Sequence, residues 1–116
     1  MGEVELTLNE YQILASRTMN KKLSKEETQL HALFEICAET GEIHSIFQKT
    51  YQGHKIKTDD LKNEIGDLLW GIAELCTVND WDLEEIALMN VHKLRARYPD
   101  GFSEERSLHR DEDDDD

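Results

Sequence analysis

The sequence lacks several features that whole classes of protein require. It contains a single proline, Pro99, so little interrupts regular structure before that point. No stretch approaches the roughly 18 uninterrupted apolar residues of a membrane span, and residues 1–5 have neither the basic start nor the apolar core of a signal peptide. We therefore expect a soluble, cytoplasmic protein that has no membrane partner.

Cysteine is also scarce. The only two, Cys37 and Cys76, both fall inside apolar helical patterns. A free thiol in such a setting usually behaves as a small buried hydrophobe. We interpret both cysteines as packing residues and not as metal ligands or redox groups.

Basic residues are outnumbered, with 13 Lys and Arg against 26 Asp and Glu and a formal net charge of -13. Binding to nucleic acid needs a basic face that releases counterions, so we expect no nucleic-acid partner. Residues 111–116 are all acidic, and such a run normally stays solvated. A chain of 116 residues suits one core, which predicts one domain over 1–105 and an acidic tail over 106–116.

Strand patterns are missing, because no run alternates apolar and polar residues between turns. Helix starts are plentiful. Three capping boxes and a threonine followed by two aspartates mark them: Thr7/Glu10, Ser24/Glu27, Asp82/Glu85 and Thr58. The prediction is an all-α four-helix bundle, with helices near 8–19, 25–52, 59–79 and 83–97.

The third predicted helix divides into two faces at 100° per residue. One face is an apolar stripe expected to form core: Leu61, Ile65, Leu68, Ile72, Leu75 and Cys76. The opposite face carries Glu64, Asp67, Gly71 and Glu74, and we expect it to be polar.

The second predicted helix is apolar over a wider arc, formed by Leu30, Leu33, Phe34, Ile36, Cys37, Ile43 and Phe47. At 1.5 Å per residue this helix is about 40 Å long, more than a four-helix domain of this size covers alone. The arc therefore predicts a homo-oligomer in which a second subunit helps to bury it.

Two acidic pairs stand at helical spacing, Glu39-x-x-Glu42 and Glu64-x-x-Asp67. Antiparallel neighbouring helices bring these four carboxylates into one cluster, where like charges repel unless cations neutralise them. Oxygen ligands without histidine or thiolate favour magnesium or manganese. A solvated acidic surface is the plain alternative for either pair alone.

Two glycines favour a metal site over a solvated acidic surface. Gly41 and Gly66 lie inside the helices beside the acids, and each costs about 1 kcal/mol relative to alanine. Such positions indicate a backbone that needs space or close approach.

An amide, three basic residues and an aromatic residue complete the candidate site. Asn90, Lys93 and Arg97 share one face of the last helix as an anion-binding row, although basic residues near a helix end also complement its dipole. Asn90 falls within an apolar seam, where a buried amide needs partners. Lys49 lies on the same polar face of the second predicted helix as Glu42. It either reaches a phosphate or faces solvent. Trp70 lies beside Asp67, as a stacking residue for a base or as core.

Successive blocks of the chain closely resemble the MazG-like family of all-α nucleoside triphosphate pyrophosphohydrolases, in particular its compact, phage-type members. These blocks are Glu39-Thr-Gly-Glu42, Gly53-His54, Glu64-Ile-Gly-Asp67-Leu-Leu-Trp70, Asn90-Val-His-Lys93-Leu and Arg97-Tyr-Pro-Asp-Gly-Phe102, with Tyr11-Gln12 similar to the first family helix. Ala38 stands where many relatives carry a further glutamate, which leaves the number of bound metal ions open.

The resemblance implies hydrolysis of a ribo- or deoxynucleoside triphosphate to the monophosphate and pyrophosphate. It implies Mg²⁺, with Mn²⁺ as a substitute, held by Glu39, Glu42, Glu64 and Asp67, and Glu39 as the base. Asn90, Lys93 and Arg97 are then expected to bind the nucleotide and its outer phosphates. The family further suggests a homodimer or homotetramer and a lean towards dGTP or GTP.

Other functions fit less well. The segment 35–41 superficially resembles part of a Nudix diphosphate hydrolase helix, but Phe34 replaces an arginine, Ala38 a glutamate and Asn20 the leading glycine. No histidine stands in the Glu-x-x-His motif of a di-iron bundle. A non-catalytic helical interaction module explains the acidic charge but neither the cationic row nor the interior glycines.

Overall fold

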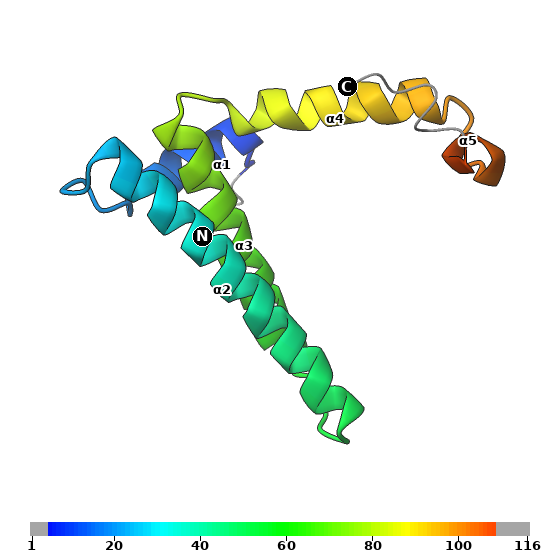
Figure 1. Ribbon diagram of the computed structural model, residues 1–116, viewed down its shortest axis with the longest axis horizontal. Helices are drawn as coiled ribbons and strands as arrows, with labels where there is room; N and C mark the ends of the chain where they lie inside the picture. The colour runs from blue at the N-terminus through cyan, green and yellow to red at the C-terminus, as the bar shows by residue number, and fades with distance from the viewer. Residues whose placement is uncertain (1–4, 109–116) are drawn as a thin grey trace. The chain divides into compact units, whose positions relative to one another are not determined.

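The computed structural model describes residues 5–108, and within them the fold is all-α, as predicted. The only strand-like feature in this range is an isolated bridge between Pro99 and Gly101. The described residues form five helices, labelled in Figure 1: α1 (Leu8–Ser16), α2 (Lys25–Tyr51), α3 (Thr58–Val78), α4 (Leu83–Arg97) and α5 (Glu104–Leu108). The acidic run 111–116 lies outside the described residues.

The short helix α5 was not predicted from the sequence. It follows the Pro99-to-Gly101 break and begins after Ser103, whose Oγ accepts a hydrogen bond from the Arg106 N–H at 3.3 Å. With five residues, α5 is too short to display an apolar period. The predicted boundary between domain and tail, at residue 105, lies inside this helix.

Helices α1 and α2 begin with the predicted reciprocal caps. The hydroxyls of Thr7 and Ser24 each accept the N–H of the glutamate three residues later, both at 3.1 Å. Glu10 and Glu27 accept the N–H of Thr7 and Ser24 in return. Each box satisfies two backbone donors that a helix start otherwise leaves without a partner.

Helix α3 begins differently from the prediction. Thr58 is its first helical residue and not its cap; Lys57 occupies the cap position and makes no side-chain capping bond. Asp59 and Asp60 lie in the first turn, as predicted, where their charge complements the helix dipole.

The chain divides into two compact units, residues 1–83 and 84–116, and each is described by itself. In the first unit α2 and α3 lie side by side as an antiparallel hairpin, and α1 packs on α3 (Figure 1). The turn at 52–57 closes the hairpin through Gly53, whose φ of 103° falls in the left-handed region that favours glycine.

The core of the first unit is small. Its buried members are Ala15, Ala73, Cys76 and Leu83, with Leu8, Tyr11, Leu69, Trp70 and Ile72 packed around them. Cys76 is 3% exposed, and burial raises the pKa of its thiol, which confirms it as a packing residue. Cys37 is exposed, so its interpretation as a buried hydrophobe was wrong.

A buried amide ties α1 to the residues at the end of the first unit. Gln12 on α1 donates from Nε2 to the Thr77 hydroxyl at 3.1 Å and to the Trp81 carbonyl at 2.8 Å. Its Oε1 accepts the N–H of Leu83, the first residue of α4, at 2.8 Å. The amide therefore holds α1 against the end of α3 and the segment that follows it as far as Leu83.

The face of α3 that we expected to be polar is the face that packs on α2. Gly71 and Glu74 are both buried, and a Cβ added at Gly71 would lie 3.1 Å from Cγ1 of Ile36. The predicted core stripe is only partly covered, and Ile65 remains 51% exposed. Because Gly71 has no Cβ, α2 and α3 approach closely at this point. This contact places the acidic face of α3, and not the apolar stripe, against α2.

The apolar arc of α2 is left largely uncovered in the described chain. Four of its large side chains are about half exposed or more: Leu30 at 51%, Leu33 at 47%, Phe34 at 66% and Phe47 at 51%. These four side chains stay exposed to solvent in the described chain. No helix within residues 5–108 is long and apolar enough to cross a membrane.

Candidate metal centre

The α2–α3 hairpin brings three of the four predicted carboxylates together. Glu39 on α2 faces Glu64 and Asp67 on α3, and one carboxylate oxygen from each lies within 4.8 Å of the other two. Glu64 and Asp67 are one helical turn apart, so both side chains project from the same face of α3. We call these three residues the carboxylate cluster.

Glu42, the fourth predicted ligand, lies one turn further along α2. Its side chain is exposed and is not among the three whose oxygens converge. Its role as a ligand stays a prediction.

The carboxylates of the cluster repel one another, and this repulsion acts on Glu39. The pKa of Glu39 is raised from 4.5 to about 7, first by a hydrogen bond with the Glu64 carboxyl, then by burial, and then by the charges of Glu64, Asp67 and Glu35. Its Oε2 is covered by neighbouring atoms and has no hydrogen-bond donor among the described residues. A cation or a proton is needed to relieve this repulsion.

The donor set fits a hard divalent cation. All three converging groups are carboxylates, and the covered Glu39 oxygen is a ligand atom without a protein partner among residues 5–108. Magnesium and manganese prefer such oxygen ligands. A Cβ added at Gly41 or Gly66 meets no atom within 4 Å, so no close contact among the described residues requires glycine at either position. The close approach that glycine permits is at Gly71 instead.

A second polar group lies in the same helix interface, and sequence reasoning missed it. Nδ1 of His31 on α2 lies 2.8 Å and 3.0 Å from the two carboxylate oxygens of Glu74 on α3. The His31 Nε2 is 3.9 Å from Oε1 of Glu35, an exposed-side contact one turn before Glu39. The available signal was spacing, since Glu64, Asp67 and Glu74 recur on one face of α3.

Trp70 is engaged with the protein in this structure. Its Nε1 donates to the Thr18 hydroxyl at 2.8 Å, and its ring meets that of His31 edge to face at a centroid distance of 6.1 Å. It also packs against the core. These contacts favour the packing interpretation, and stacking on a base stays a prediction.

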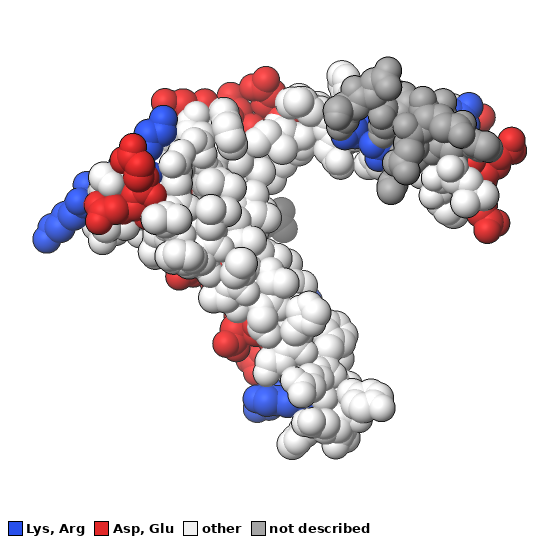
Figure 2. Space-filling model, viewed as in Figure 1, with Lys and Arg blue, Asp and Glu red and all other residues white. Residues whose placement is uncertain are grey.

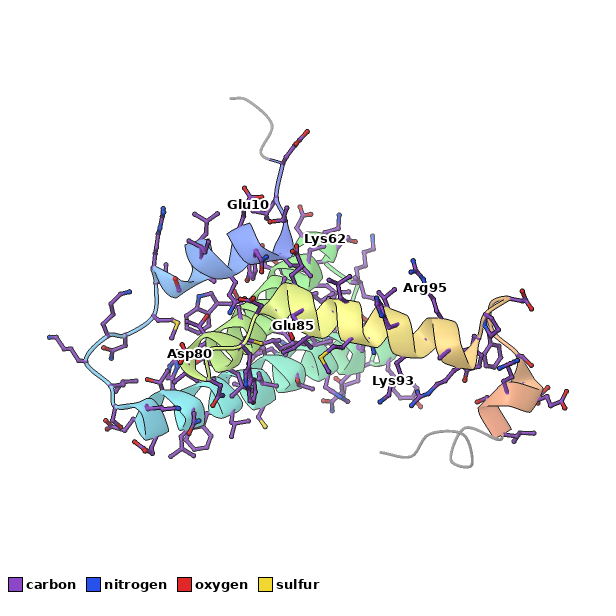
Figure 3. All side chains as sticks on the ribbon, turned by 90° about the horizontal axis from the view of Figure 1, so that it is seen from above. Glu10, Lys62, Asp80, Glu85, Lys93 and Arg95 are labelled. Atoms are coloured by element: carbon purple, nitrogen blue, oxygen red, sulfur yellow. The ribbon has the colours of Figure 1, made fainter. Side chains whose placement is uncertain are left out.

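The remaining predicted cations lie on two elements. Lys49 is exposed on α2 and lines a cavity at the closed end of the hairpin. On α4, Lys93 is exposed and Arg97 is half-buried, with its carbonyl accepting from Nη1 of Arg106 at 3.2 Å. Lys93 and Arg95 project to opposite sides of α4 (Figure 3), so Arg95 does not belong to the predicted row.

Asn90 was expected within an apolar seam of α4, and that expectation was wrong. Asn90 is exposed, and the seam residues Ile86 and Leu94 are themselves 40% and 44% exposed. The amide therefore needs no buried partner, and its proposed role rests on its spacing from Lys93 and Arg97.

The fold and the carboxylate cluster define an all-α protein with a candidate divalent-cation site. The chain belongs to the MazG family, because residues 18–102 match the MazG nucleotide pyrophosphohydrolase domain. Nucleotide pyrophosphohydrolysis is the general activity of this domain, which places the chain among the hydrolases. The match spans α2 to α4 and includes every predicted site residue. No curated protein and no solved structure matches the chain.

Proposed function

We propose that this protein is a Mg²⁺-dependent nucleoside triphosphate pyrophosphohydrolase, which releases the monophosphate and pyrophosphate, with Mn²⁺ able to replace Mg²⁺. The observation that carries the proposal is the convergence of Glu39, Glu64 and Asp67 across the hairpin, within a chain of the MazG family. The raised pKa of Glu39 supports it, because the cluster is unfavourable without a neutralising cation.

In this proposal Glu39, Glu64 and Asp67 hold the metal, and Glu42 joins them from the next turn of α2. When bound, the metal supplies charge neutralisation for the phosphates and makes water more acidic. Glu39 accepts the proton of the attacking water. This role rests on the family resemblance.

The cations act on the leaving group. Attack at the α-phosphate develops negative charge on the departing pyrophosphate, and positive side chains placed there lower the barrier. Lys93 and Arg97 are proposed for this role, with Asn90 positioning the nucleotide and Lys49 contributing from α2. Trp70 is proposed to stack on the base, and a preference for dGTP or GTP rests on the family resemblance alone.

A homo-oligomer is part of the proposal. The half-exposed Leu33 and the more exposed Phe34 support a second copy of the chain as the cover for the α2 arc. The family resemblance suggests a homodimer or a homotetramer.

The deciding experiment is product analysis. The protein is incubated with Mg²⁺ and a panel of ribo- and deoxynucleoside triphosphates, without added pyrophosphatase, and early products are separated. We expect monophosphate and pyrophosphate in equal amounts and no early free phosphate. Diphosphate with free phosphate as first products would contradict the proposal. No turnover on any substrate, together with specific binding of a helical protein, would favour the interaction-module alternative.

A further inference from the structure

The contact between Gly71 and Ile36 lies one helical turn from the carboxylate cluster. Gly71 follows Asp67 by four residues on α3. On α2, Ile36 precedes Glu39 by three residues. At 1.5 Å per residue, the contact is about 5 Å from the cluster along the hairpin. A Cβ added at Gly71 would lie 3.1 Å from Cγ1 of Ile36, 3.4 Å from its backbone nitrogen and 3.5 Å from Cβ of Glu35.

The atoms around this position belong to the body of α2 and not to the end of a flexible side chain. A contact of 3.1 Å requires the neighbour to give way by a few tenths of an ångström. Ile36 is β-branched, and such a side chain keeps one strongly preferred χ1 rotamer in a helix. A methyl group at position 71 is therefore accommodated by a small increase in the distance between α2 and α3.

The hairpin is held together on both sides of the cluster. Beyond Gly71, Nδ1 of His31 lies 2.8 Å from Oε1 of the buried Glu74. At the closed end, the turn at 52–57 joins the two helices covalently. Acidic side chains lie between these ends on the face shown in Figure 2, and the carboxylates of the cluster repel one another. A separation imposed at Gly71 is therefore taken up most easily at the cluster.

The size of this separation matches the difference between two common divalent cations. Mg²⁺ requires near-octahedral oxygen ligands at about 2.0–2.1 Å, whereas Ca²⁺ accepts a more flexible arrangement at about 2.3–2.6 Å. Asp67 has a single methylene between its backbone and its carboxylate, so its oxygens follow α3 closely. Oε2 of Glu39 is covered by neighbouring atoms, which limits its movement. A few tenths of an ångström between the helices is thus enough to change which ion the cluster suits.

We infer that Gly71 is a positioning residue that sets the cation selectivity of the metal centre. By permitting the close approach of α2 to α3, it keeps the carboxylate cluster at a spacing that suits Mg²⁺ better than Ca²⁺. Gly71 acts through Glu39 and the two acids of α3, and it is not itself a ligand. The inference deepens the proposed function and rests on its metal site.

The test compares Gly71→Ala with the wild type and with Gly66→Ala. Gly66 lies on the same helix beside the cluster, and a Cβ there meets no atom within 4 Å. Affinities for Mg²⁺ and Ca²⁺ are measured without substrate, from the rise in melting temperature with ion concentration. Gly71→Ala is expected to weaken Mg²⁺ binding about tenfold and to change Ca²⁺ binding less than about twofold. Gly66→Ala is expected to keep the wild-type ratio of the two affinities.

Removing the atom that the new methyl group meets provides a rescue. Ile36→Ala deletes Cγ1, the nearest of the three neighbouring atoms. The double variant Gly71→Ala with Ile36→Ala is expected to recover most of the Mg²⁺ affinity, and the four proteins form a double-mutant cycle. A purely structural role for Gly71 would lower the melting temperature without ions but leave the ratio of the two affinities unchanged.

A second variant tests the spacing without altering the helix contact. Glu39→Asp shortens the ligand on α2 by one methylene, which widens the cluster from the opposite helix. Its affinity ratio is expected to move in favour of Ca²⁺, as in Gly71→Ala. Helical circular dichroism checks the fold of every variant. Should Gly71→Ala not fold, an unchanged ratio in Glu39→Asp would still overturn the inference, because spacing would not then set selectivity.

The outcomes separate this inference from the proposed function. A wild type that hydrolyses triphosphates with Mg²⁺, with an unchanged affinity ratio in Gly71→Ala, would overturn the inference and leave the function intact. A wild type that binds Mg²⁺ but hydrolyses no triphosphate would defeat the function, while a shifted ratio in Gly71→Ala would still support the inference. An equal shift in Gly66→Ala would also overturn it, because the helix propensity of alanine and not the spacing would be responsible.

Discussion

Nδ1 of His31 lies 2.8 Å from Oε1 of Glu74, and the Glu74 side chain is only 1% exposed. The pair joins α2 to α3 in the interface that also contains the carboxylate cluster. A buried carboxylate is tolerated in a helix interface only when it keeps a hydrogen-bond partner. His31 therefore has a structural role that no motif in the sequence indicated.

Replacing His31 by alanine is expected to lower the free energy of unfolding by about 3 kcal/mol, because the buried Glu74 loses its partner. Urea denaturation measures the change. Glu35→Ala is the matched control, since its oxygen is 3.9 Å from the His31 Nε2 and both side chains are more than a third exposed. That substitution is expected to cost less than about 1 kcal/mol. Equal losses in the two variants would contradict the structural role of the His31–Glu74 contact.

The metal-free protein is expected to lose stability as pH rises from about 4.5 to about 7. The pKa of Glu39 is raised from 4.5 to about 7 in the fold, so between these values the folded state holds a proton that the unfolded state has released. Its stabilising contribution is therefore present at low pH and lost as pH rises through the folded pKa. Melting temperatures in chelator at several pH values test this, and Glu39→Gln is expected to flatten that part of the profile.

Glu42→Gln and Asp67→Asn are each expected to abolish turnover while the helical signal persists. Both changes remove a proposed ligand charge from an exposed side chain, so the fold tolerates them. The loss of activity should exceed the roughly 100-fold that removal of an outer-shell partner costs a metal site. Activity is measured in excess Mg²⁺. Near-normal rates in both variants would remove these residues from the site, and loss in Glu35→Gln instead would favour a Nudix-type arrangement.

Arg97→Ala is expected to slow hydrolysis by about tenfold or more, because the departing pyrophosphate loses a positive partner. Arg95→Ala removes the same charge from the same helix, but Arg95 lies on the opposite side of α4 from Lys93 (Figure 3). Steady-state rates are compared at equal folded fraction. If the two substitutions slowed turnover equally, general charge and not the predicted row would be responsible.

The wild type is expected to give at least a dimeric mass in light scattering at micromolar concentration. Phe34 is 66% exposed and Leu33 is 47% exposed on the α2 arc, and burying this surface favours association. Phe34→Glu is expected to shift the mass towards the monomer, because a buried carboxylate without a partner is costly. A monomeric wild type would contradict the proposed oligomer.

Features that depend on near neighbours in the chain were the ones that the sequence predicted well. The Ser24/Glu27 box and the start of α2 follow from residues three apart, and the sharing of a face by Glu64 and Asp67 follows from helical spacing. The meeting of Glu39 with α3 needed one further assumption, a short antiparallel turn.

Features that depend on the choice of helix face were not predictable in this way. Apolar periodicity favoured a core stripe on α3 that includes Ile65, but the close approach at Gly71 turns the acidic face towards α2 and buries Glu74. Periodicity ranks faces by hydrophobicity, and it carries no information on a specific contact such as His31 with Glu74. On the face that it ranked first, Ile65 stays 51% exposed.

The hydrogen bond from the Leu83 N–H to Gln12 allows the packing of α1 to be followed by hydrogen exchange at that one amide. Leu83 opens α4, and its N–H would have no intrahelical acceptor, but Gln12 Oε1 accepts it at 2.8 Å in a buried position. Hydrogen exchange at the Leu83 amide is therefore slow only while α1 stays in place, and its opening free energy reports how readily this helix detaches. Since α1 precedes the matched residues 18–102, this exchange measurement reports on a helix that lies outside the family match.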